Sequence, residues 1–233
     1  MRRAILVLAS TTFSVAAVHS AVGQPPAVAP RAAAPNSSVK RVSKQPPAVK
    51  RPLEGLVQQH IMVLPVQYLT FADSLGWAER IPSVQEYLAT LDDELTFALG
   101  ERGVKTRWTF AEAITRSVKR NPELGVDPHA ISAEQVRMGS RPDNWQLHEP
   151  LASQVRSLVA LSEARYVLFP VEVRVTSARG IGSATLHVVL IDARLAQVQW
   201  AGDVHGRGAT AFTPALAADL ASRLADLVAP PAP

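Results

Sequence analysis

The sequence of 233 residues contains no cysteine. This absence excludes disulfides, thiolate zinc sites, thiol-linked haem and a cysteine nucleophile. It also excludes the lipid anchor of bacterial lipoproteins, which is attached to a cysteine. After the N-terminal region, no apolar run is long enough to span a bilayer. We therefore expect a folded part held together by its own core, without covalent cross-links.

The first 52 residues contain no acidic side chain. Residues 1–23 begin with two arginines, continue with a short apolar run and end in small residues, which is typical of a secretory signal peptide. An uncleaved membrane anchor is the alternative. Residues 24–52 hold seven prolines and six basic residues, and we expect them to be a disordered linker. This linker is either a solvated spacer or a segment that binds an anionic surface or polyanion.

The basic charge of the chain belongs to this N-terminal region. The first 52 residues carry eight Lys and Arg, whereas the rest carries 16 Lys and Arg against 20 Asp and Glu, a net charge of −4. The overall charge of +4 therefore does not indicate a DNA-binding surface on the domain. The remaining residues, 53–229, are enough for one domain with a substantial core, and residues 230–233 are expected to be a frayed tail.

The pattern of apolar residues predicts alternating strands and helices. A strand is expected over residues 56–69, a loop over 71–81, and a helix from Ser83 to about Gly100 that begins with an S-x-x-E capping box. Its solvated face should carry Glu86, Asp92, Asp93 and Glu101. Further elements are a short strand over 104–110, helices over 111–120 and 127–137, a loop to 149, and a helix from Pro150.

The C-terminal third predicts three strands and a helix. Residues 165–176 alternate strictly, with Val167, Phe169, Val171, Val173 and Val175 on one face, and Pro170 predicts a sheet edge or a bulge. Residues 187–206 are expected to form two strands joined by a turn at Asp192 and Arg194. Thr213 is the expected N-cap of a final helix. The predicted fold class is α/β (α+β), with a mixed sheet of about four to five strands, a C-terminal antiparallel meander, and three or four packed helices.

The segment "HVVLIDARLAQVQWAGDVHG" suggests one candidate site. Placing the apolar residues of both strands on one face pairs Leu190 with Val198 and Val188 with Trp200, so that His187 lies opposite Ala201. His187, Asp203 and His205 then share the other face, with Asp203 diagonal to His187. We interpret them as an ordinary polar sheet face. The alternative is a metal or acid/base site, which would need further ligands that no spacing supplies.

Other polar groups give weaker indications of a functional site. Asp127 and His129 flank a proline, His148 and Glu149 precede a helix, and both pairs are of a kind common in loops. The glycines fit no phosphate-binding pattern and no G-x-S-x-G elbow is present. The tryptophans Trp77, Trp108 and Trp145 are expected to pack, with a binding surface as the alternative. We therefore assign no catalytic, cofactor-binding or metal-binding residue and expect no cofactor.

Several motifs resemble a family of bacterial envelope domains. They are "VLPV" at residues 63–66, a helix that ends at Gly103, and "ARYVLFPVEVRV" followed by "DARLAQVQW". The family is the α/β domain shared by the amino-terminal part of TolB, the curli-secretion lipoprotein CsgG and the peptidoglycan-synthase activator LpoB. This chain departs from it in having no lipid-accepting cysteine, and in placing Leu195-Ala196 where Thr-Gly is common.

The resemblance implies a non-catalytic domain that binds proteins or assembles into oligomers. Together with the predicted signal peptide, it leads us to expect a periplasmic or secreted binding or assembly domain, and not an enzyme. Its partners would be envelope proteins, further copies of itself, or an anionic surface that contacts residues 24–52, with no specific nucleic acid and no transmembrane span after signal cleavage. The alternatives are a small metal-dependent or acid/base hydrolase that uses His187, Asp203 and His205, and polyanion binding by the linker.

Overall fold

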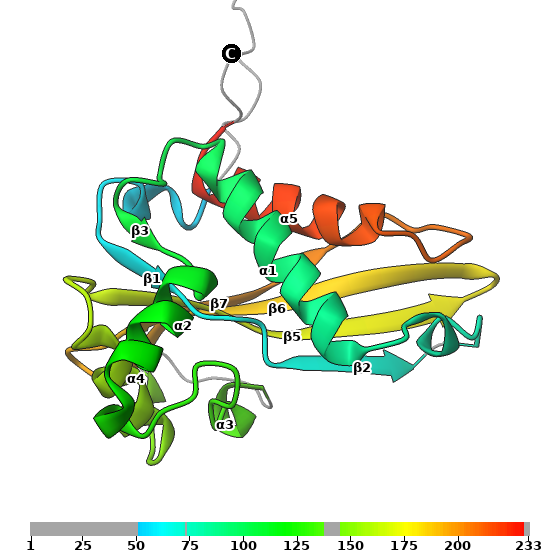
Figure 1. The fold of residues 1–233 in the computed structure, drawn as a ribbon. Helices are drawn as coiled ribbons and strands as arrows, with labels where there is room; N and C mark the ends of the chain where they lie inside the picture. Colours follow the sequence, from blue (N-terminus) through cyan, green and yellow to red (C-terminus); the bar gives the residue numbers. More distant parts are fainter. Residues whose placement is uncertain (1–50, 73, 138–144, 231–233) are drawn as a thin grey trace, which may run out of the picture. The chain divides into compact units, whose positions relative to one another are not determined.

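A computed structural model describes residues 51–72, 74–137 and 145–230. In these residues a seven-stranded mixed sheet forms the centre of the fold (Figure 1). Its strand order is β3-β1-β5-β6-β7-β4, and β2 also pairs with β5. The strands are β1 (Ile61–Val63), β2 (Tyr68–Ala72), β3 (Trp108–Thr109), β4 (Trp145–Gln146), β5 (Tyr166–Ala178), β6 (Ile181–Asp192) and β7 (Gln197–His205). The expected mixed α/β fold and its antiparallel C-terminal meander are confirmed.

The sheet has more strands than the four to five expected, for two reasons. The strand predicted over residues 56–69 is two strands, because Pro65 has no N–H to donate and separates β1 from β2, which both run parallel to β5. The β2 strand also continues to Ala72, into the predicted loop. In addition, the two-residue strand β4 lies in a second predicted loop and pairs with β7. The strand expected over residues 104–110 is reduced to β3.

Helices cover both faces of the sheet (Figure 1). Helices α1 (Val84–Gly100) and α5 (Ala215–Val228) pack on one face, where their leucines join those of β5 and β6. Helices α2 (Ala111–Arg120), α3 (Glu134–Arg137) and α4 (Leu151–Val159) pack on the other, around Phe169 and Ile191. The short 3₁₀ helices are η1 (Glu54–Leu56), η2 (Ala78–Arg80) and η3 (Pro122–Leu124). Because helices cover both faces of the central strands, β5 is buried on both faces along most of its length.

The predicted helix ends are confirmed at α1 and wrong at α5. Ser83 Oγ accepts a hydrogen bond from Glu86 N at 3.2 Å, as the capping motif predicts. At α5, no side-chain hydrogen bond caps the helix, and Pro214 occupies the N-cap position expected for Thr213. The helix expected over residues 127–137 is reduced to α3.

A bulge in β5 changes the predicted faces. The register with β6 shifts between Pro170 and Glu172, and β5 is a central strand, so the bulge expected at Pro170 is present and the sheet edge is not. Val167, Phe169 and Val171 contact one core, whereas Val173 and Val175 contact the core on the opposite face. The prediction that all five point the same way is therefore wrong, because the extra residue reverses the alternation.

The register of the β6–β7 hairpin also differs from the prediction. Leu190 pairs with Trp200 and not with Val198, and Leu186 pairs with Val204. A shift between Leu190 and Ile191 then pairs Ile191 with Val198. Because of this shift, the connection between β6 and β7 is one residue shorter than it would be if the pairing from Leu190 outward continued to the turn. Asp192 ends β6, and its Oδ1 accepts hydrogen bonds from the N–H groups of Arg194 and Leu195, as expected of a turn aspartate.

Candidate functional site: the cleft between α1 and α2

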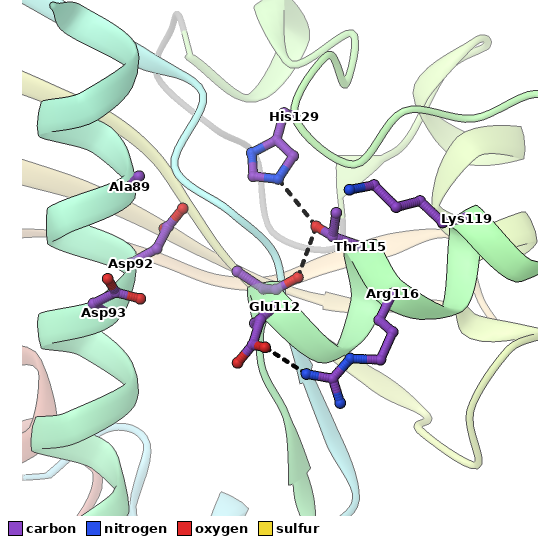
Figure 2. Close-up of a pocket in the computed structure, with 9 residues that line it drawn as sticks. Ala89, Asp92, Asp93, Glu112, Thr115, Arg116, Lys119 and His129 are labelled. Carbon is purple, nitrogen blue, oxygen red and sulfur yellow. Dashed lines mark hydrogen bonds and ion pairs between the residues drawn. The ribbon is translucent and has the colours of Figure 1, made fainter.

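Helices α1 and α2 enclose a cleft of about 350 Å³ (Figure 2). They lie on either side of the segment that joins β1 to β2, and Val66 of that segment contacts α1 through Asp92. The lining residues are Ala89, Asp92 and Asp93 of α1, Ala111, Glu112, Thr115, Arg116 and Lys119 of α2, and His129 of the following loop. A cleft of this size with several converging polar groups is a candidate binding site.

Asp92 is the buried polar group of this cleft. Its side chain belongs to a residue only 7% exposed, and its Oδ1 accepts a hydrogen bond of 2.9 Å from Val66 N. Burial raises the pKa of the Asp92 carboxyl to about 7; the bond from Val66 lowers it and the charge of Asp93 raises it further. The expectation that Asp92 is solvated is therefore wrong. A carboxyl that changes charge near neutral pH inside a cleft is typical of a functional position.

The α2 side of the cleft carries basic groups. The guanidinium of Arg116 forms an ion pair with Glu112 one turn earlier, and Lys119 lies one turn further along the helix. Thr115 Oγ1 lies 3.0 Å from His129 Nε2 (Figure 2). The backbone N–H of His129 in turn donates to Asp127 Oδ1 at 2.9 Å, so Asp127 stabilises the loop that positions the imidazole. The cleft thus has an acidic wall on α1 and a largely basic wall on α2.

The cleft is not predicted by the sequence. The helix pattern places Asp92 and Asp93 together on a solvated face, and Asp127 and His129 have the pattern of loop residues. The interpretation of Asp127 holds, but His129 also lines the cleft. The available signal was the Asp-Asp pair directly after Leu91: at 100° per residue, Asp92 falls at the border of the apolar stripe and Asp93 beyond it. Its burial depends on the β1–β2 connection, which is distant in sequence.

The predicted candidates His187 and Asp203 lie on the sheet, away from this cleft. Strand register aligns Tyr68, Glu172, His187 and Asp203 in one row across β2, β5, β6 and β7. His187 Nδ1 is 2.5 Å from Asp203 Oδ1, because the two residues are directly opposite and not diagonal, as the predicted register had them. Asp203 Oδ2 is also 3.9 Å from Arg174.

Glu172 is the centre of this row. Its carboxylate accepts hydrogen bonds from Arg137 at 2.7 and 2.9 Å, from Arg174 at 2.8 Å and from Thr70 at 3.0 Å. Burial raises the pKa of Glu172, but these donors outweigh burial and hold the pKa below its ordinary value. The row is therefore a network of charges that satisfy one another, which is the structure of a polar sheet face more than of a reactive site.

His205 does not join His187 and Asp203. Its Nδ1 lies 3.2 Å from the hydroxyl of Thr185, the residue opposite it on β6. In the described residues no group of three or more His, Cys, Asp or Glu side chains is arranged to hold a metal ion. The three candidates thus share a face, as predicted, but only two of them are in contact.

The remaining sequence candidates have structural roles. Glu149 bonds Ser153 and Arg156 at the start of α4, and the backbone N–H of His148 donates to Gln135. Trp77 and Trp108 are buried, which confirms that they pack. None of the helices in the described ranges is long and apolar enough to cross a bilayer.

No family model and no curated protein matches this chain. Solved structures resemble it at low identity. The NMR structure of Escherichia coli LpoB has a TM-score of 0.36 at 16% identity and covers 87% of this chain and 93% of its own. The lipoprotein GNA1162 from Neisseria meningitidis has a TM-score of 0.36 at 16% identity, over 72% of this chain and 96% of its own. A PelC dodecamer from Paraburkholderia phytofirmans has a TM-score of 0.34 at 14% identity, over 74% of this chain and 91% of its own.

LpoB is a member of the resembled family, whereas the likeness to TolB and CsgG stays a prediction. Likenesses of this size assign neither a family nor a function to the chain.

Proposed function

We propose that this protein is an exported binding or assembly domain that acts through protein contacts in the bacterial cell envelope and catalyses no reaction. The predicted signal peptide (residues 1–23) supports export to the periplasm or to the outside of the cell. The predicted linker (24–52) would separate the domain, residues 53–229, from whatever the N-terminal region contacts. The residues before 51 lie outside the described part of the chain, so this organisation rests on sequence alone.

The observation that carries the proposal is the outer face of α1. Phe97 is 67% exposed, although its neighbours Leu95 and Leu99 are buried. An aromatic ring in water contributes little to folding, whereas covering it with a partner gains about 1.5–3 kcal/mol. Exposed aromatic side chains of this kind are common anchors of protein interfaces.

The charge of α1 defines the partner. Residues 84–100 contain four acidic side chains and no basic one. Asp93, one turn before Phe97, is exposed. A partner for this face should therefore present an apolar pocket for Phe97 surrounded by Lys and Arg, because opposite charges favour association and exclude other acidic surfaces. We assign the contact to an envelope protein with such a basic, apolar surface.

Site-specific crosslinking tests the proposal. A photoreactive residue at position 97 of the full chain, expressed in the envelope, should give a discrete crosslinked protein, whereas one at the exposed Glu163 should not. With the photoreactive residue moved to the exposed position 101, one turn after Phe97, Phe97→Asp should abolish crosslinking without changing the stability of the domain. Leu195→Asp is the matched control, since Leu195 is also exposed but lies in the β6–β7 turn. Identical crosslinking from positions 97 and 163, or no crosslinking from either, contradicts the proposal.

The hydrolase alternative is favoured by one observation, the 2.5 Å contact between His187 and Asp203. It predicts bound metal or hydrolytic activity in the purified chain, and loss of either in His205→Ala. The polyanion alternative predicts salt-sensitive binding that disappears when residues 24–52 are deleted. Neither result is expected if α1 is the functional surface.

A further inference from the structure

The two walls of the α1–α2 cleft have opposite charge. Asp92 and Asp93 lie on the α1 side, while Arg116 and Lys119 lie on the α2 side (Figure 2). Arg116 is paired with Glu112, but no described residue pairs with Lys119. A ligand with a single charge would be attracted by one wall and repelled by the other. A ligand with both charges can lie across the cleft and satisfy both walls.

Asp92 shows that the cleft is more than a surface depression. Figure 2 shows its carboxylate directed from α1 into the space beside α2. Only Oδ1 has a hydrogen-bond partner among the described residues, the N–H of Val66. Its other oxygen has no donor among these residues, although the side chain as a whole is more than nine-tenths buried. This oxygen is not itself among the buried unpaired atoms and is open to the cleft, where a ligand ammonium can donate to it.

The volume limits the ligand to a small molecule. Ligand sites commonly have volumes of about 300–1,000 Å³, and this cleft of about 350 Å³ lies at the lower end. Ala89 and Ala111 supply small apolar surface between the polar groups, against which a short carbon chain can pack.

We propose that the cleft binds a small zwitterion of the amino-acid type, with its ammonium at Asp92 and Asp93 and its carboxylate at Lys119. At the α2 side of the cleft, Thr115 donates its hydroxyl to the backbone oxygen of Ala111 and lies 3.0 Å from His129 Nε2, so this pair lines the site and Lys119 is the donor for the carboxylate. This site is separate from the protein contact proposed for Phe97, and each can be present without the other.

The proposal predicts a pH dependence of binding. The charged groups around Asp92 are Asp93 on α1, Glu112, Arg116 and Lys119 on α2, and His129 on the loop. An ammonium binds the ionised form of Asp92, whose pKa burial raises to about 7. The ionised fraction, and with it the affinity, should increase about tenfold between pH 6 and pH 8. His129→Gln removes the imidazole and separates its contribution from that of Asp92.

Isothermal titration calorimetry of the full chain tests the site. The probes are glycine, 4-aminobutyrate and 6-aminohexanoate, which separate the two charges by increasing distances. Hexanoate and hexylammonium each keep one charge of the longest probe. At least one zwitterion should bind, and the single-charge analogues should bind at least about tenfold more weakly, since a charged hydrogen bond contributes about 1.5–3 kcal/mol.

Variants locate the site. Asp92→Asn keeps an acceptor for Val66 and should weaken binding about tenfold or more and remove its pH dependence. Lys119→Met should weaken it similarly at every pH. Glu101→Gln and Lys105→Met change the same charges outside the cleft and should bind as the natural chain does. Binding of no zwitterion, equal binding of a single-charge analogue, or unchanged binding in Asp92→Asn would overturn the proposal.

Discussion

Asp92→Asn should make the protein more stable at neutral and alkaline pH. The substitution removes a charge that the cleft solvates poorly, and it keeps an oxygen that accepts the hydrogen bond from Val66 N. The folded-state pKa of Asp92 is raised to about 7 from the ordinary 3.8. Its stability contribution is therefore fully present below about pH 4 and is lost as pH rises through 7.

The size of the effect follows from these two pKa values. Their difference corresponds to about 4 kcal/mol of stability above pH 8, because a pKa difference of one unit corresponds to about 1.4 kcal/mol. Water in the cleft reduces this figure, and we expect about 2–4 kcal/mol at pH 8. At pH 5 the carboxyl is mostly protonated in the folded state, so the advantage of Asp92→Asn should shrink to about 1 kcal/mol.

Urea unfolding at pH 5, 6, 7 and 8, monitored by circular dichroism, measures this difference. Asp93→Asn is the matched control, since Asp93 is adjacent and exposed, and its change should stay within about 0.5 kcal/mol. The reasoning is refuted if the natural chain and Asp92→Asn have parallel pH profiles, or if Asp92→Asn is the less stable at pH 8. A substitution that stabilises the fold and weakens zwitterion binding would show that the carboxylate is kept for function.

Three further substitutions test the packing, the turn and the ion-pair row by the same unfolding assay. Gly182→Ala should cost about 2 kcal/mol or more, because the new methyl group would overlap the ring of Trp77. Ala196→Gly should add about 0.5–1 kcal/mol, because Ala196 has a φ of 51°, which favours glycine. Arg137→Met should cost about 1–3 kcal/mol at pH 7, because Glu172 stays buried with fewer donors. That cost should decrease as pH falls and Glu172 becomes protonated. A carboxyl whose pKa is lowered by folding stabilises the folded state only while it is ionised, at pH values above that pKa.

Each of these has a control elsewhere in the chain. Gly55→Ala adds a methyl group that meets nothing within 4 Å and should be neutral. Ala160→Gly, at a φ of −60°, should lower stability by about 0.5–1 kcal/mol, the opposite sign to Ala196→Gly. Arg156→Met breaks an exposed pair with Glu149 and should change the stability little, because water screens this pair. Equal effects in a variant and its control would contradict the explanation given for that variant.

Local patterns predicted the elements and the limits of several of them. Ser83 begins α1 and Asn121 ends α2, because capping and helix termination depend on residues within one turn. The order of strands and helices and the polarity of the sheet followed from hydrophobic period and segment length. They required no knowledge of which residues meet across the fold.

Strand register and burial could not be predicted in this way. The bulges at Val171 and between Leu190 and Ile191 leave no distinct mark in an alternating apolar pattern, yet each shifts the residues that follow to new partners. The predicted register of β6 and β7 had a tighter turn and no bulge, and these two differences together separated His187 from Asp203, which are in direct contact.

The sequence by itself determined the α/β class, the charge division between the N-terminal region and the domain, and the lack of any thiol chemistry, because these depend on composition and local period. Only the tertiary structure decided that Asp92 is buried and faces Lys119. The two residues are 27 positions apart on different helices, and the β1–β2 connection that buries Asp92 comes 26 residues before it. A helix pattern indicates which residues leave water, but the neighbouring elements determine whether a residue at the edge of that pattern is solvated or enclosed.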